Sequence, residues 1–171
     1  MTRTAFLTLS DIPRGARVFL DSSIFLHHFA GLSPQCRTLL ERCERADVRG
    51  ATSAFVLAEV AQRLMCLEAV AQGLVSPGHV GRKLRERPDV TQKLEAHEEA
   101  TAQIPLMGVE VLALDLRVLL AAGALRRRVG LPAAASLVAA GAREAGIEAV
   151  ASAEPDLERV DGLTLYRPMD L

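Results

Sequence analysis

The chain has 171 residues, of which 50% are hydrophobic and 24% charged, and its formal net charge is -1. This length is typical of one domain, and this composition excludes an intrinsically disordered chain. The balanced charge excludes a basic surface over the whole protein, and an aromatic content of 4% argues against a base-stacking platform. Any nucleic-acid site must therefore be a local one.

The spacing of the cysteines and the hydropathy of the chain indicate the cellular compartment in which we expect the protein. Cys36, Cys43 and Cys66 match no zinc or CxxC pattern, which favours reduced thiols packed as small hydrophobic side chains. Residues 1–17 lack the apolar stretch of a signal peptide, and no uncharged run of about 18 apolar residues predicts a membrane span. We therefore expect a cytoplasmic protein.

The elements of the N-terminal part are predicted from apolar runs and helix caps. The run that ends in Asp21 is typical of a strand buried on both faces of a parallel sheet, while Ser33-Pro34 and Ser53 are typical helix starts. The predicted elements are a strand over residues 17–21, a helix over 22–29, a helix from 34 to about 46, a weak strand over 48–52 and a helix over 54–71.

Residues 72–108 change in composition and are predicted as a helical arm, because about 35 residues bury too little surface to fold alone. The arm holds a basic stretch over residues 82–87 and then a helix from about 90 to 106. The elements predicted after it are a strand over 109–114, a helix from Asp115 to 129, a helix from 130–132 to Gly146, a strand over 147–151 and a last edge strand over 163–166. Strands separated by helices predict one α/β domain over residues 1–171, a sandwich with a mainly parallel sheet of four or five strands.

Two acidic residues stand out against this pattern. Asp21 ends a predicted strand, where sites form in parallel sheets, although it can equally cap the helix that follows. Glu59 lies within a strongly apolar helix, a costly place for a carboxylate unless something uses it. The alternative for Glu59 is an i,i+4 ion pair with Arg63 on a solvated helix face.

Glu154 and Asp156 follow another predicted strand and could reach the same sheet edge, although each alone is an ordinary loop acid. Together with Asp21 and Glu59 they would form an oxygen-rich cluster of the kind that Mg²⁺ or Mn²⁺ prefers. A metal ion held in this way assists phosphodiester hydrolysis.

The basic segments and the His27-His28 pair have simpler explanations. Residues 126–128 lie at a predicted helix C-terminus, where the helix dipole favours cations, and residues 82–87 are the better candidate for phosphate contact, although a solvated helix face explains them too. The two histidines have no Glu or Cys at ligand spacing, so we expect a partly buried pair, with contact to substrate as the alternative.

Four segments together resemble the ordered motifs of PIN domains, especially of VapC-like toxins. They are VFLDSS at residues 18–23, TSAFVLAEV at 52–60, GLP at 130–132 with its helix, and AVASAE at 149–154. The resemblance covers about residues 17–168. It implies a three-layer α/β/α sandwich that uses clustered acids and Mg²⁺ or Mn²⁺ to cut RNA.

The resemblance also implies roles for individual residues. Asp21, Glu59 and Glu154 match catalytic, metal-binding acids, with Asp156 as a further candidate ligand. Ser23 and Ser152 match the small hydroxyl residues that orient the cluster. The third acid of the family is replaced by Ala135, whose methyl group cannot bind a metal.

Two functions follow from this degenerate site. The first is a metal-dependent ribonuclease, a candidate toxin, with weakened activity and a weakly bound Mg²⁺ or Mn²⁺ because Ala135 replaces an acid. The alternative is a catalytically silent PIN-like module that binds RNA or a protein partner. The resemblance implies RNA as substrate and an antitoxin as partner, and it leaves a homodimer open.

Overall fold

The computed structural model describes residues 7–171. The first six residues, part of the segment predicted to lack a signal peptide, lie outside this range. The strands are β1 (Leu7–Thr8), β2 (Arg17–Leu20), β3 (Arg49–Ser53), β4 (Val109–Leu112), β5 (Ala149–Ala151) and β6 (Thr164–Arg167). The α-helices are α1 (Ser22–Phe29), α2 (Pro34–Glu44), α3 (Ala54–Ala71), α4 (Val80–Glu86), α5 (Pro88–Thr91), α6 (Ala96–Leu106), α7 (Leu116–Val129) and α8 (Ala133–Glu144), with short 3-10 helices at Leu9–Asp11 (η1) and Pro155–Arg159 (η2).

The six strands form one parallel sheet in the order β1-β6-β5-β2-β3-β4. This confirms the predicted α/β class. The sheet is larger than the predicted four or five strands because Leu7 and Thr8 pair with Tyr166 and Arg167. The final strand β6 is therefore an inner strand, and the prediction that it lies at the edge was wrong. A strand of two residues is too short to show the alternation by which strands are recognised.

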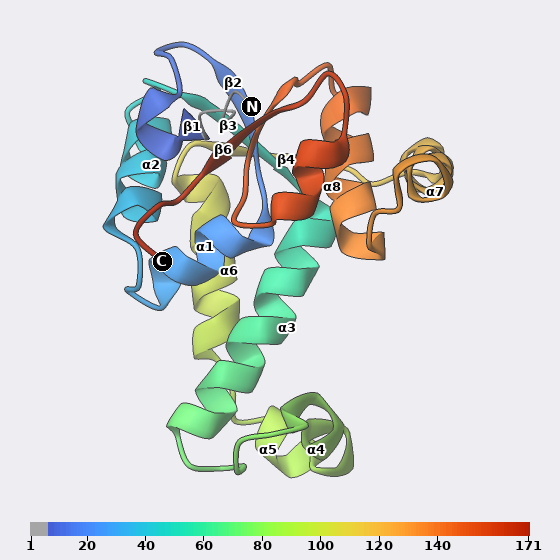
Figure 1. Cartoon of the computed structure of the whole chain (residues 1–171). Coiled ribbons are helices and arrows are strands. Elements are labelled where there is room, and N and C mark those ends of the chain that lie inside the picture. Colours follow the sequence, from blue (N-terminus) through green and yellow to red (C-terminus); the bar gives the residue numbers. More distant parts are fainter. Residues whose placement is uncertain (1–6) are drawn as a thin grey trace.

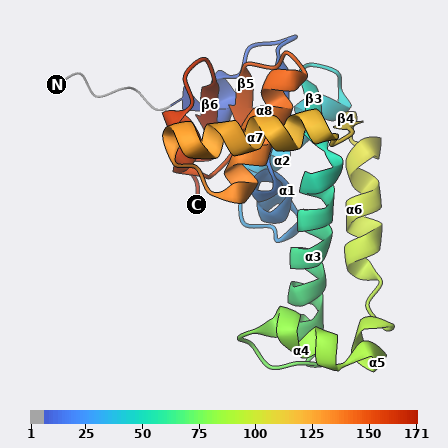
Figure 2. The same ribbon diagram turned by 90° about the vertical axis from the view of Figure 1, so that its right-hand side faces the viewer.

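Helices cover both faces of this sheet, with α2 on one side and α7 and α8 on the other (Figures 1 and 2). Consecutive residues of β2 point to opposite faces, as a strand requires. Phe19 lies opposite Gly141 of α8, and Leu20 lies beside Gly50 on the face of α2. At Gly50 an added Cβ atom would lie 2.8 Å from the Cys43 sulfur, so α2 packs directly on the backbone of β3.

All three cysteines are free, as predicted, and two of them are buried on α2. Burial raises the pKa of the Cys43 thiol to about 11, so this side chain packs as a neutral group. No helix within residues 7–171 has the length and apolar character that a membrane span requires.

The helical arm extends from the sheet edge at which α3 begins (Figure 1). Helix α6 packs along α3, and α4 and α5 cover the far end of α3 around a small apolar cluster. The sequence predicts a single helix over residues 90–106, but in the structure the helix is interrupted: α5 ends at Thr91 and α6 begins at Ala96. The interruption coincides with Glu68 of α3, whose carboxylate accepts hydrogen bonds from the first backbone N–H groups of α6. A tertiary contact of this kind is invisible to local sequence patterns.

Candidate functional site

The candidate site lies where the strand order of the parallel sheet reverses, between β2 and β5. From β2 the chain continues to β3 and β4 on one side, while β5 and β6 occupy the other side. In open parallel sheets, such a switch point forms a crevice beyond the carboxyl ends of the strands. Asp21 follows β2 directly and Ser152 follows β5 directly, and the Asp21 N–H donates to the Ala151 carbonyl at 3.0 Å.

Asp21 is buried at this edge, with 5% of its surface exposed. Its carboxylate accepts hydrogen bonds from the Ser22 N–H at 2.7 Å, the Ser23 hydroxyl at 3.3 Å and the Ser152 hydroxyl at 2.5 Å. Asp21 therefore caps α1 and also joins β2 to β5. A buried carboxylate is tolerated where such donors compensate for the loss of water.

The two serines fix the loop after β5 as well as the carboxylate. The Ser23 hydroxyl accepts from the Ala153 N–H, and the Ser152 hydroxyl accepts from the Glu154 N–H, both at 3.0 Å. The backbone of residues 152–154 is thereby held against the start of α1. The structure thus brings together Asp21, Ser23, Ser152 and the main chain of Glu154.

The side chains of the other candidate acids make no hydrogen bond to the Asp21 cluster. Glu59 is half-buried on α3, which begins at the end of β3 and contacts α1. Among the described residues, neither Glu59 nor the exposed Glu154 side chain makes a hydrogen bond or ion pair, so the alternative Glu59–Arg63 pair is not formed. Asp156 is engaged by Arg159, with 2.8 Å between the charged groups.

Ala135, which stands in the position of the missing acid, belongs to the hydrophobic core. Ala135 is 8% exposed on the first turn of α8 and belongs to the main hydrophobic cluster of the sheet. Its neighbour Ser136 is fully buried, and the Ser136 hydroxyl accepts a hydrogen bond from the Arg126 guanidinium at 3.0 Å. At this position the chain therefore has a buried methyl group in place of a carboxylate.

Within residues 7–171, no group of three or more His, Cys, Asp or Glu side chains is gathered closely enough to hold a metal ion. The donor chemistry nevertheless suits Mg²⁺, which proteins commonly hold with one or two carboxylates, with water and substrate phosphate completing the shell. The residues present fit a metal bound weakly by few protein ligands.

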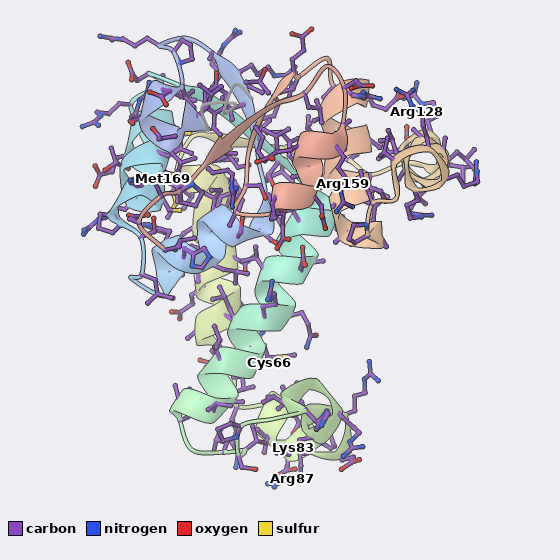
Figure 3. All side chains as sticks on the ribbon, in the orientation of Figure 1. Cys66, Lys83, Arg87, Arg128, Arg159 and Met169 are labelled. Atoms are coloured by element: carbon purple, nitrogen blue, oxygen red, sulfur yellow. The ribbon has the colours of Figure 1, made fainter. Side chains whose placement is uncertain are left out.

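A cleft of about 540 Å³ opens beside this edge. Ser23, Ala153 and Glu154 line its end at the sheet, and Cys66, labelled on α3 in Figure 3, lies further along it. Between them the cleft is lined by His27 of α1 and Arg63 of α3.

Neither His27 nor Arg63 is predicted as a site residue from the sequence. His27 is predicted as half of a partly buried histidine pair, and Arg63 as the alternative ion-pair partner of Glu59. The available signal was their spacing: each lies four residues after a candidate site residue, Ser23 or Glu59, and so one helical turn further along the same face.

The PIN domain family model matches residues 18–163. Because this is most of the chain, the protein belongs to the PIN domain family. Proteins of this family are in general nucleases that depend on divalent metal ions. A search of curated protein sequences found no match.

Solved structures with the same fold include toxin–antitoxin complexes. VapBC2 from Rickettsia felis bound to a promoter DNA fragment is similar at a TM-score of 0.61 and 15% identity, over 89% of this chain and 98% of that one. A toxin–antitoxin complex from Klebsiella pneumoniae has a TM-score of 0.53 and 15% identity, over 90% and 99% of the two chains. FitAcB from Neisseria gonorrhoeae has a TM-score of 0.51 and 20% identity, over 90% and 99%. This similarity shows that the chain has the fold of these structures, and the family model supports a nuclease of the PIN type.

Proposed function

We propose that the chain is a toxin ribonuclease that hydrolyses RNA phosphodiesters with weakly bound Mg²⁺ or Mn²⁺. The observation that carries this proposal is Asp21, a buried carboxylate held by two serine hydroxyls at the switch point of the sheet. A helix cap alone does not require a buried carboxylate, because an exposed Asp or Ser caps a helix equally well. A carboxylate fixed from two strands at the site-forming edge instead suits a ligand that needs fixed negative charge.

Each site residue has a defined part in this proposal. Asp21, Glu59 and Glu154 are the catalytic acids and hold the metal, with Asp156 as a further ligand once it is released from Arg159. Ser23 and Ser152 keep the Asp21 carboxylate in one orientation. The metal supplies a Lewis acid that neutralises charge on the phosphodiester.

The test is cleavage of a labelled structured RNA in the presence of Mn²⁺. Native protein should cut the RNA, whereas Asp21→Asn and Glu59→Gln should abolish cleavage because each removes a charge of the site. Glu44→Gln, an exposed carboxylate on α2 without partners in residues 7–171, is the matched control and should retain full activity. Cleavage that survives Asp21→Asn contradicts the site assignment.

A second candidate function is a silent module that holds RNA or a protein partner in the same cleft. Two observations favour it: the methyl group of Ala135 in the place of an acid, and the absence of a three-residue metal group within residues 7–171. RNA binding by a native protein that cuts nothing under any metal condition would select this alternative.

The proposed toxin acts in the cytoplasm and is restrained by an antitoxin protein, in keeping with the toxin–antitoxin complexes that share its fold. A second copy of the chain is the other proposed partner. Helix α7 lies on the outside of the molecule (Figure 2). Its residues Leu116, Leu119 and Leu120 are 67%, 46% and 65% exposed.

A further inference from the structure

The cleft beside Asp21 continues away from the sheet between two helices. Ser23 and His27 line one wall from α1, Gln62 and Arg63 line the other from α3, and Val80 and Gly81 at the start of α4 lie at the far end. A ligand that fills this cleft and reaches Glu154 therefore contacts both helices, with His27 on α1 and Arg63 on α3.

The residues of interest have the same spacing on both helices that line the cleft. His27 follows Ser23 by four residues, and Arg63 follows Glu59 by four residues. Four residues are about one turn, or roughly 6 Å along a helix. Each wall thus presents a nitrogen-bearing side chain one turn beyond an oxygen-bearing residue of the site.

The charge of Arg63 is available to a ligand. Arg63 is exposed, and its side chain makes no hydrogen bond or ion pair with any of residues 7–171. Guanidinium groups stay protonated and match the oxygens of a phosphate in a bidentate way. Two basic residues at the tip of the arm, both labelled in Figure 3, are engaged: Lys83 donates to the Ser76 and Pro77 carbonyls, and Arg87 pairs with Asp89.

We propose that Arg63 binds an RNA phosphate neighbouring the one that is cleaved, so that a single strand is positioned along the cleft between α1 and α3. The proposal rests on the proposed function, since it assigns a phosphate subsite to the same site. The volume of the cleft is typical of small-ligand sites, which favours an unpaired segment over a duplex. A phosphate subsite of this kind adds binding that the reduced set of acids cannot provide.

The test measures RNA binding without cleavage. A fluorescently labelled single-stranded RNA is titrated with native protein in EDTA, and the affinity is followed from low to moderate salt. Arg63→Gln should weaken binding about 10-fold, as expected for a charge-assisted phosphate contact. It should also reduce the slope of log K against log salt by about 0.7, because one fewer counterion is released.

Two further variants separate charge from structure. Arg63→Lys keeps the charge and should therefore keep the salt slope of native protein. If Arg63 had only a structural role, Arg63→Gln would leave the salt slope unchanged as well. Arg37→Gln, an exposed arginine of α2 outside the cleft lining, is the matched control and should bind like native protein. Unchanged affinity and slope in Arg63→Gln overturn the proposal, and so does the absence of RNA binding by native protein.

The same variants distinguish failure of the phosphate subsite from failure of the proposed nuclease activity. Metal-dependent cleavage that needs Asp21, together with no effect of Arg63→Gln on binding, overturns the phosphate subsite alone. Loss of binding in Arg63→Gln, together with no cleavage under any metal condition, supports the subsite and rejects the nuclease.

Discussion

The Ser152 hydroxyl donates a 2.5 Å hydrogen bond to the Asp21 carboxylate across 131 positions of sequence. The same hydroxyl accepts from the Glu154 N–H, so Ser152→Ala removes partners from two groups at once. We expect this variant to lower the free energy of unfolding by about 1 to 3 kcal/mol, because polar groups in a buried setting lose their hydrogen bonds. Urea denaturation measures the change. Ser10→Ala, at an exposed serine, is the control and should have little effect.

Ala135→Asp restores a carboxylate to the position of the missing family acid. We expect it to raise Mn²⁺-dependent RNA cleavage by about 10-fold or more, since loss of a metal-site partner typically costs this much. Ala133→Asp adds the same charge to the exposed start of α8 and controls for a general effect of negative charge. Equal activities of the two variants would show that position 135 has no special relation to the site.

The metal preference follows from the small number of carboxylates. Mn²⁺ should bind the native protein more tightly than Mg²⁺, because Mg²⁺ gives up its water shell reluctantly and needs near-ideal octahedral geometry. Isothermal calorimetry with each metal measures the difference, and the Asp21→Asn variant shows whether the heat comes from this site. Tight stoichiometric Mg²⁺ binding would indicate that another acid, with Asp156 the first candidate, completes the cluster.

Glu68 offers a stability test away from the site. Burial raises the pKa of this carboxyl, but hydrogen bonds from the His97 ring and from backbone N–H groups at the start of α6 outweigh burial and leave the pKa below its usual value. Glu68→Gln should therefore lower the free energy of unfolding at pH 7 by about 2 kcal/mol. Glu99→Gln is the control, because Glu99 is an exposed residue of α6 whose side chain makes no hydrogen bond or ion pair within residues 7–171.

The sign of the pH dependence follows from the lowered pKa. The stabilisation by Glu68 is complete above the carboxyl pKa of the unfolded chain and is lost as the pH falls through the lower pKa of the folded state. Denaturation curves of native protein and Glu68→Gln should thus converge in acid. A difference that stays constant down to low pH would assign the effect to packing instead of charge.

The leucines of α7 test the proposed homodimer. Leu116→Glu combined with Leu120→Glu should convert dimers to monomers in size-exclusion chromatography with light scattering, because the apolar face then carries like charges against its copy. Leu106→Glu changes a leucine of α6 that is 79% exposed and should leave the assembly unchanged. Native protein that stays monomeric at high concentration contradicts the dimer.

The sequence predicted the parallel architecture well because buried strands and capped helices are written locally. Residues 22–29 and 54–71 are helices with the expected limits, since Asp21 and Ser53 provide their caps. The short strand β1 and the split of the arm helix at Glu68 were missed, because both depend on partners far away in sequence. The contact of Asp21 with Ser23 follows from their spacing, whereas the cleft between His27 and Arg63 requires knowledge of how α1 and α3 cross.

The parallel sheet also sets when the candidate site can form during synthesis. β1 pairs with β6, the final strand, and Asp21 is completed by Ser152, which follows β5. A nascent chain can form the α1–α3 segment early, but the ribosome must deliver the last strands before Asp21 gains its second hydroxyl partner. Translation that stops before residue 152 therefore releases a fragment that has Asp21 but lacks Ser152, so the proposed toxin stays inert until the segment after β5 has been synthesised.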